Sequence, residues 1–178
     1  MRYLLLLITF YSLSFSSITK SVILYYQFKN YEKACKEGIK IVDKSNEAIL
    51  SLIGAACAKS DQIDSLAKIA VKLSSKREFR ENRSYFLTLL LQKSLILQFL
   101  KDDTNIENLK FPKTDHIISL IFSKITKNEY KTVSKNPKTI SIKNADKTYR
   151  ITFSKTEPST IIIKEYFQDT VMKTHRIK

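Results

Sequence analysis

The two cysteines offer the clearest chemistry in this chain of 178 residues. Cys35 and Cys57 lie in two segments whose apolar residues recur at helical spacing, on either side of a turn at residues 43–45. If these helices are antiparallel, the cysteines lie roughly 15 and 18 Å from the turn, at a rise of about 1.5 Å per residue. Because these two distances from the turn are similar, the cysteines are expected to face each other and to form a disulfide. Two buried free thiols are the alternative. A redox pair is not expected, because C-x-x-C spacing and an adjacent histidine are both missing.

Asp115 and His116 are the only candidates for a catalytic dyad. They follow Thr114 at the expected start of a helix, where a capping or first-turn role is the simpler interpretation. Catalysis would need a nucleophile, and neither a G-x-S-x-G nor a papain-type cysteine motif is present. The second histidine, His175, alternates with Lys173 and Ile177 on a predicted terminal strand and is expected at the surface; without an H-E-x-x-H motif we expect no zinc site. We therefore predict no catalytic, cofactor-binding or metal-binding residues.

The first sixteen residues have the pattern of a secretory signal peptide. A positive start is followed by an apolar run over residues 3–11 and then by small hydroxylated residues. Ser14 and Ser16 are the small residues that signal peptidase requires, so we expect cleavage near Ser16. A retained anchor is the alternative, but the run is shorter than the roughly 20 residues that cross a bilayer. We therefore predict a periplasmic protein whose mature chain has no transmembrane segment.

The chain is strongly basic, with a formal net charge of +14. Such a charge raises the question of nucleic-acid or anionic-surface binding. Only six of the 31 basic residues are arginine, the side chain best suited to bidentate phosphate contacts, and the charge is spread along the whole chain. A solvated surface is one interpretation, and attraction to an acidic partner or envelope surface is another. Export argues against nucleic acid as the partner.

The mature sequence begins with a helical part. Helical spacing of apolar residues predicts five helices, over about residues 22–43, 46–56, 61–73, 78–100 and 114–125. The fourth segment is apolar nearly all round, but Gln92 and Lys93 lie at its middle, so we expect a buried central helix instead of a membrane span. The first three segments are short and rich in alanine and glycine, which is typical of helical-hairpin packing of the tetratricopeptide (TPR-like) kind.

After Lys127 the apolar period changes from 3.6 to 2. Alternation predicts short strands around residues 139–143, 149–153, 161–163 and 171–177. Turns are expected at residues 144–147 and 168–169, and no helical pattern separates the strands, which indicates an antiparallel β-meander. The expected fold is α+β. A signal peptide (1–16) precedes a helical domain (17–127) and a β-sheet module (128–178), which is either separate or packed on the helices.

Several stretches of the helical part resemble an uncharacterised family of exported proteins from epsilon-class bacteria. The resemblance covers about half of the chain. It rests on the segment Leu52–Leu66 with Ala55-Ala56-Cys57 and Ser60-Asp61-Gln62-Ile63-Asp64, and on Tyr85-Phe86, Leu91-Gln92-Lys93 and Pro112-Lys113-Thr114-Asp115. It implies a periplasmic setting and brings no activity, cofactor or site residue.

The sequence thus favours an exported, non-enzymatic protein that mediates protein–protein or envelope interaction. Its expected partner is a protein or an anionic envelope surface, and we expect no cofactor. One alternative is an envelope enzyme that uses Asp115 and His116. The other is a small-molecule or lipid carrier, which would need a large apolar cavity.

Overall fold

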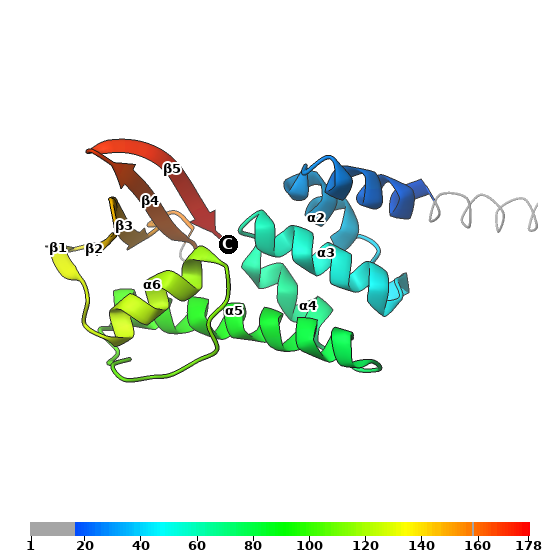
Figure 1. Cartoon of the computed structure of the whole chain (residues 1–178), viewed down its shortest axis with the longest axis horizontal. Coiled ribbons are helices and arrows are strands. Elements are labelled where there is room, and N and C mark those ends of the chain that lie inside the picture. The colour runs from blue at the N-terminus through cyan, green and yellow to red at the C-terminus, as the bar shows by residue number, and fades with distance from the viewer. Residues whose placement is uncertain (1–16, 158) are drawn as a thin grey trace, which may run out of the picture. The chain divides into compact units, whose positions relative to one another are not determined.

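The computed structural model describes residues 17–157 and 159–178, and these residues have the α+β organisation that the sequence predicts (Figure 1). Six α-helices lie in the described residues and are followed by a five-stranded antiparallel sheet. The predicted signal peptide, residues 1–16, lies outside the described residues. The chain divides into two compact units between Phe86 and Leu87, inside the longest helix, α5 (Arg77–Asp102). The change from helix to strand and the division into units therefore occur at different places.

The prediction of one helix over residues 22–43 is wrong. Residues 17–27 form one helix, and α2 (Tyr31–Ile39) forms the next. Between them Lys29 has a φ of 58°, a left-handed conformation that interrupts a right-handed helix. Phe28 is therefore 79% exposed, although its spacing indicated a buried helix face. This break is the reason why the structure has six helices where the sequence predicts five.

Polar and aromatic side chains hold the junction between these two helices. The side chain of Asn30 accepts a hydrogen bond from the Lys33 backbone N–H at 3.3 Å and so caps α2. The rings of Tyr26 and Tyr31 pack edge to face, with centroids 5.3 Å apart. The ammonium of Lys59 lies 4.9 Å from the Tyr31 ring centroid. These contacts tie residues 17–27 to the helices that follow.

Glycine allows close approach between helices in the first unit. A Cβ on Gly38 of α2 would lie only 2.7 Å from Ile53 of α3 (Glu47–Lys59). A Cβ on Gly54 would collide with the ring of Phe86. The small residues of the sequence therefore lie where helices touch.

The third predicted helix is shorter than its apolar pattern suggested. A 3-10 turn at Ile63–Ser65 is followed by α4 (Leu66–Ala70), in place of a helix over residues 61–73. Asp61 has a φ of 62°, which prevents a helix from starting there. The spacing of apolar residues overestimated the length of this helix, because the apolar residues of the neighbouring turns also pack into the core.

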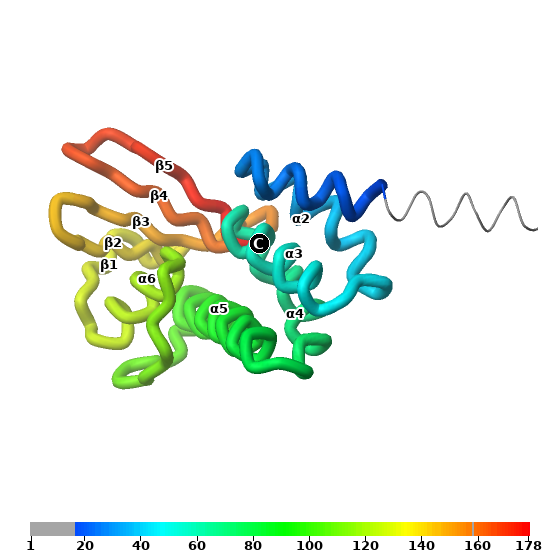
Figure 2. The backbone as a smooth tube through the Cα atoms, turned by 45° about the vertical axis from the view of Figure 1, so that its right-hand side comes forward, coloured from blue at the N-terminus to red at the C-terminus, as the bar shows by residue number. Residues whose placement is uncertain are grey.

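The second unit contains the C-terminal part of α5, the helix α6 (Ile117–Thr126) and the sheet. Its strands are β1 (Lys131–Lys135), β2 (Lys138–Asn144), β3 (Lys147–Phe153), β4 (Ile161–Phe167) and β5 (Thr170–Ile177). Each pairs with the next along the chain, so the predicted meander is confirmed (Figure 2). The two tight turns at residues 145–146 and 168–169 contain residues with positive φ, as two-residue hairpins require.

Isoleucine builds the core of the second unit. The inner face of the sheet buries Ile140, Ile142, Ile151, Ile161, Ile163 and Ile177. α6 and the C-terminal part of α5 lie on the same side of the sheet (Figure 2). Gln92 and Lys93 of α5 are buried, whereas Leu87 and Leu91 are 43% exposed, so the apolar stretch is not covered all round. Among the described residues, no helix has the length and apolarity that crossing a membrane requires.

Candidate functional site

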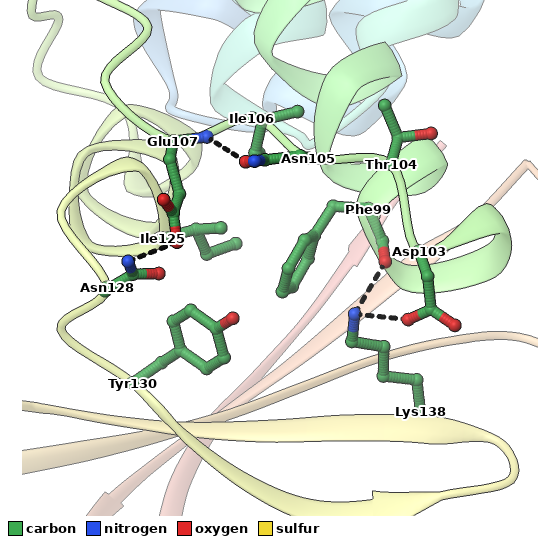
Figure 3. Close-up of a pocket in the computed structure, with 10 residues that line it drawn as sticks. All are labelled: Phe99, Asp103, Thr104, Asn105, Ile106, Glu107, Ile125, Asn128, Tyr130 and Lys138. Carbon is green, nitrogen blue, oxygen red and sulfur yellow. Dashed lines mark hydrogen bonds and ion pairs between the residues drawn. The ribbon is translucent and has the colours of Figure 1, made fainter.

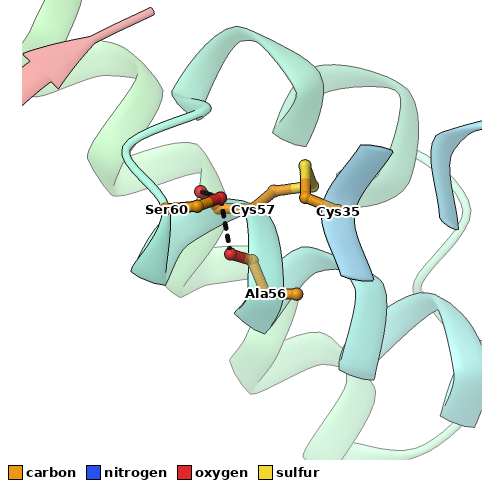
Figure 4. Close-up of a disulfide and its surroundings, with 4 residues drawn as sticks. All are labelled: Cys35, Ala56, Cys57 and Ser60. Carbon is orange, nitrogen blue, oxygen red and sulfur yellow. Dashed lines mark hydrogen bonds between the residues drawn. A yellow bond between two sulfur atoms is a disulfide. The ribbon is translucent and has the colours of Figure 1, made fainter. Parts of the chain in front are cut away.

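The two cysteines form the disulfide that the sequence predicts. The bond joins Cys35 of α2 to Cys57 of α3, with Cα atoms 4.8 Å apart (Figure 4). Both residues are buried, at 2% and 0% exposure, and no free thiol remains in the chain. Closing 22 residues of chain removes entropy from the unfolded state and stabilises the fold by about 3 kcal/mol. The bond therefore stabilises the first helical hairpin, and its sulfur atoms are not available for chemistry.

His116 has a capping role at the start of α6. The Nδ1 atom of its ring accepts a hydrogen bond from the backbone N–H of Ile118 at 3.2 Å. The backbone N–H of His116 donates to Thr114 Oγ1 at 3.3 Å. Thr114 and Asp115 were the predicted caps, but the chain enters the helix later and the imidazole takes this place. Neither Asp115 nor His116 lines any of the three cavities described for the second unit. The prediction that His175 lies at the surface is wrong: it is 8% exposed and lies opposite Ile163 on the inner face of the sheet.

The outer face of the sheet carries basic side chains from each of its strands. Strand register aligns one residue from each strand in a single row: Lys131, Ser141, Arg150, Lys164 and Thr174. Lys143 of β2 and Arg176 of β5 belong to the same face. All five basic side chains are exposed. Serine, threonine and tyrosine occupy most of the positions between them, and we call this surface the basic face.

No strand residue on the basic face is acidic, although Glu129, which precedes β1, lines a cavity together with Lys131 and Lys143. Within the five strands the only carboxylate belongs to Glu165, which lies on the inner face and forms an ion pair with Lys147 at 2.7 Å. The hydrogen bond that Lys147 donates to the Glu165 carboxylate raises the pKa of Lys147. At the edge of the basic face, Glu157 reaches Arg176 at 3.2 Å. Lys131, Lys143, Arg150 and Lys164 thus form a positive surface with no carboxylate among the strand residues that share their face.

Arg150 and Lys164 are directly opposite each other on neighbouring strands. Like charges in this position cost about 0.2–1 kcal/mol. The guanidinium of Arg150 lies 4.8 Å from the ring centroid of Tyr166, a cation–π contact that positions it but does not neutralise it. The fold therefore tolerates a repulsion that a bound anion would relieve.

An exposed apolar tip adjoins the basic face. Phe167, Val171 and Met172 flank the turn between β4 and β5 and are 37%, 47% and 63% exposed. Three large apolar side chains thus gather at one hairpin tip, next to a surface that carries mainly charge and hydroxyl groups. The sequence reading missed both this tip and the alignment of the basic row. The alternation of Lys and Arg with isoleucine in the strands was a signal from which the basic face could have been found.

A small cavity of about 190 Å³ lies beneath β2 (Figure 3). Lys138 reaches into it and donates to the backbone carbonyl of Phe99 at 3.0 Å and to Asp103 Oδ1 at 2.7 Å. Its ammonium lies 3.6 Å from the Phe99 ring centroid, and that ring packs edge to face with Tyr130. Because the lysine satisfies the C-terminal end of α5, we interpret it as a structural link between helix and sheet.

The described residues contain no cluster of three His, Cys, Asp or Glu side chains that could hold a metal ion. Comparison with protein-family models, with curated proteins and with solved structures finds no match. The basic face is therefore the feature from which a function has to be argued.

Proposed function

We propose that this chain is an exported, periplasmic protein that acts by binding and not by catalysis, and that its basic face docks on the anionic phospholipid surface of the cell envelope. The disulfide supports an oxidising compartment, because such bonds persist there. The pattern of residues 1–16 and the resemblance to exported epsilon-class proteins support the same location.

The row of basic side chains across the sheet carries the proposal. Near an anionic bilayer each lysine or arginine contributes about 1 kcal/mol of attraction. Lys131, Lys143, Arg150 and Lys164 lie on one face and would reach such a surface together. Their summed attraction is several kcal/mol, which is sufficient for reversible binding.

A lipid surface fits this face better than a folded acidic protein. Protein interfaces depend on a desolvated centre with aromatic or aliphatic anchors. The middle of the basic face instead carries Arg150, Lys164 and hydroxyl side chains, and the exposed apolar residues of the sheet lie at its margins, at Val133 of the edge strand β1 and at the β4–β5 tip. Charges that attract headgroups, next to apolar side chains that enter the interfacial layer, are the combination found in peripheral membrane proteins.

An envelope enzyme built on Asp115 and His116 has less support. His116 accepts a backbone hydrogen bond as a helix cap. A general acid or base has to reach a bound substrate, and neither of these two residues lines one of the three described cavities.

Co-sedimentation with lipid vesicles tests the proposal. We expect the protein to bind vesicles that contain phosphatidylglycerol and not to bind vesicles of phosphatidylcholine alone. High salt should dissociate the bound protein. The variant Arg150→Gln/Lys164→Gln should lose roughly ten- to thirtyfold in partitioning, since two contributions of about 1 kcal/mol disappear.

The matched control is Lys36→Gln/Lys68→Gln, which removes the same charge from exposed positions of the first unit. It should retain most of the binding. Equal losses in both variants would show that net charge alone acts, and a folded protein that binds no anionic vesicle at low salt would contradict the proposal. Capture of an acidic protein by the basic face without vesicle binding would also count against it.

Export has a separate test. The protein should be recovered from the periplasmic fraction of cells that express the full chain. N-terminal sequencing should then begin at Ser17 or within a few residues of it. Recovery from the cytoplasm with Met1 intact would contradict this part of the proposal.

A further inference from the structure

A cavity of the second unit lies against α6. It has a volume of about 420 Å³ and is formed by α5, α6 and residues 108–113 of the segment that connects them. The backbone N–H of Asn108 donates to the carbonyl of Thr126 at 2.9 Å, which holds the connecting segment over the end of α6. This volume falls within the range of about 300–1,000 Å³ that is typical of small-molecule sites.

One side of the cavity is apolar. Leu109, Phe111 and Phe122 line it, and the two aromatic rings pack edge to face with centroids 5.4 Å apart. Leu109 is 40% exposed, so this wall reaches from the core of the unit to the surface. An apolar ligand body could displace water from this wall without a change in the fold.

The base of the cavity is a buried polar group. Gln92 is 1% exposed, and its Oε1 accepts a hydrogen bond from Ser119 Oγ at 2.7 Å. Its Nε2 donates to the carbonyl of Pro112 at 3.4 Å, a long bond. Because an amide nitrogen carries two protons, Gln92 has a second N–H that can donate to a ligand oxygen.

The charged side chains that line the cavity are all positive. Lys110, Lys113 and Lys127 lie at its rim, and the lining contains no carboxylate. All three are exposed and are long enough to bend over the opening. A ligand with an apolar body and a single anionic head would therefore meet complementary groups at both of its ends.

We propose that this cavity binds an amphipathic anion, with its apolar body against Phe111, Phe122 and Leu109 and its carboxylate or phosphate head among the three lysines. The inference does not rest on the basic face, which consists of other residues. A neutral amphiphile lacks the head that the lysines attract, and a free inorganic anion lacks the body that the aromatic wall receives. Both parts of the ligand are needed.

Calorimetric titration of the protein, purified from cells that express the full chain, tests the site. The probes are octanoate, octyl phosphate, octanol and inorganic phosphate. We expect the two amphipathic anions to bind at least tenfold more tightly than octanol, and inorganic phosphate not to bind. The ratio between octanoate and octyl phosphate shows which head the lysines prefer. Amide NMR shifts on titration should concentrate in residues 108–127.

Variants separate the cavity from general charge effects. Lys110→Gln/Lys113→Gln/Lys127→Gln should weaken octanoate binding at least tenfold, and the control Lys36→Gln/Lys68→Gln/Lys76→Gln should not. Leu109→Gln, at a partly exposed position, should weaken binding through the apolar wall. No octanoate binding by the folded protein, equal effects of the two triple variants, or NMR shifts outside residues 108–127 would overturn the proposal. Arg150→Gln/Lys164→Gln should bind octanoate normally, so failure of this site and failure of the basic face are distinguishable.

Discussion

The two units differ in how they are stabilised and in what they expose. The first unit has a covalent bond, Cys35–Cys57, at its centre, and polar side chains such as Asn30 and Glu47 accept backbone hydrogen bonds at its turns. The second unit contains no cysteine and depends on its isoleucine core and on Lys138. It also carries the basic face and the cavity against α6. Both binding proposals therefore concern the second unit.

Removal of the disulfide is the strongest test of this comparison. Cys35→Ser/Cys57→Ser should destabilise the first unit by about 3 kcal/mol, because the unfolded chain regains the entropy of the closed loop. Hydrogen exchange should show amide protection in α2 and α3 falling by a factor on the order of 100, while amides of β3 and β4 change little. An equal loss of amide protection in both units would mean that the two units unfold together. Treatment of the double variant with a reductant, as control, should change nothing further.

Loss of the Lys138 link should have the next largest effect, and it should fall on the second unit. Lys138→Met keeps the stem of the side chain but leaves the Phe99 carbonyl without this donor, at a cost of about 1–3 kcal/mol. Urea unfolding followed through amides of the sheet measures the loss. Asp103→Asn is the control: Asp103 is 83% exposed, so its ion pair contributes less than about 1 kcal/mol. If both variants lost the same stability, the carbonyl contact would not be the important one.

The cap of α6 should have a smaller effect. His116→Ala removes the acceptor for the Ile118 N–H and should cost about 1 kcal/mol, whereas His116→Asn, a good capping residue, should retain the stability. Thermal unfolding of the three proteins measures the difference. Asparagine can cap a helix but cannot replace a histidine that transfers protons. The His116→Asn variant therefore distinguishes a capping role from a catalytic one. Loss of stability in His116→Asn as large as in His116→Ala would contradict the capping role.

The smallest effect should come from Glu47 in the first unit, and it depends on pH. Its carboxylate accepts hydrogen bonds from the Ser75 hydroxyl and from the backbone N–H groups of Ser74 and Ser75, and these bonds lower the pKa of Glu47. Because the folded-state pKa is the lower one, the stabilisation is present above the usual glutamate value of 4.5 and is lost as the pH falls through the folded-state pKa. Wild type should be more stable than Glu47→Gln at pH 7. The difference should shrink on acidification, and a difference that stays constant down to pH 3 would contradict this.

The sequence predicted those parts of the fold that depend on neighbouring residues. The strand pattern and the turns at 145–146 and 168–169 follow from alternation and from turn-forming residues, and the long helix follows from its spacing. The break at Lys29 was missed because the apolar spacing continues through it, while Asn30 offers an alternative cap. The third helix was overestimated for the same reason.

The candidate sites were predicted less well. The Cys35–Cys57 bond could be predicted because a single turn joins the two helices. The distance of each cysteine from that turn then follows from the number of residues between them. The row that places Arg150 opposite Lys164 depends on strand register, and the cavity against α6 depends on how residues 108–113 fold back. Contacts between distant residues decide both of these features.

The sequence by itself determined that helices precede an antiparallel sheet, where two β-turns lie and which cysteines pair, because these features follow from local spacing and backbone preference. The tertiary structure alone decided that basic residues from several strands form one face, and that three lysines and two aromatic rings surround one cavity. The physical reason is that alternation shows only which residues of one strand share a face, whereas pairing register and cavity walls arise from contacts between segments that are distant in the chain.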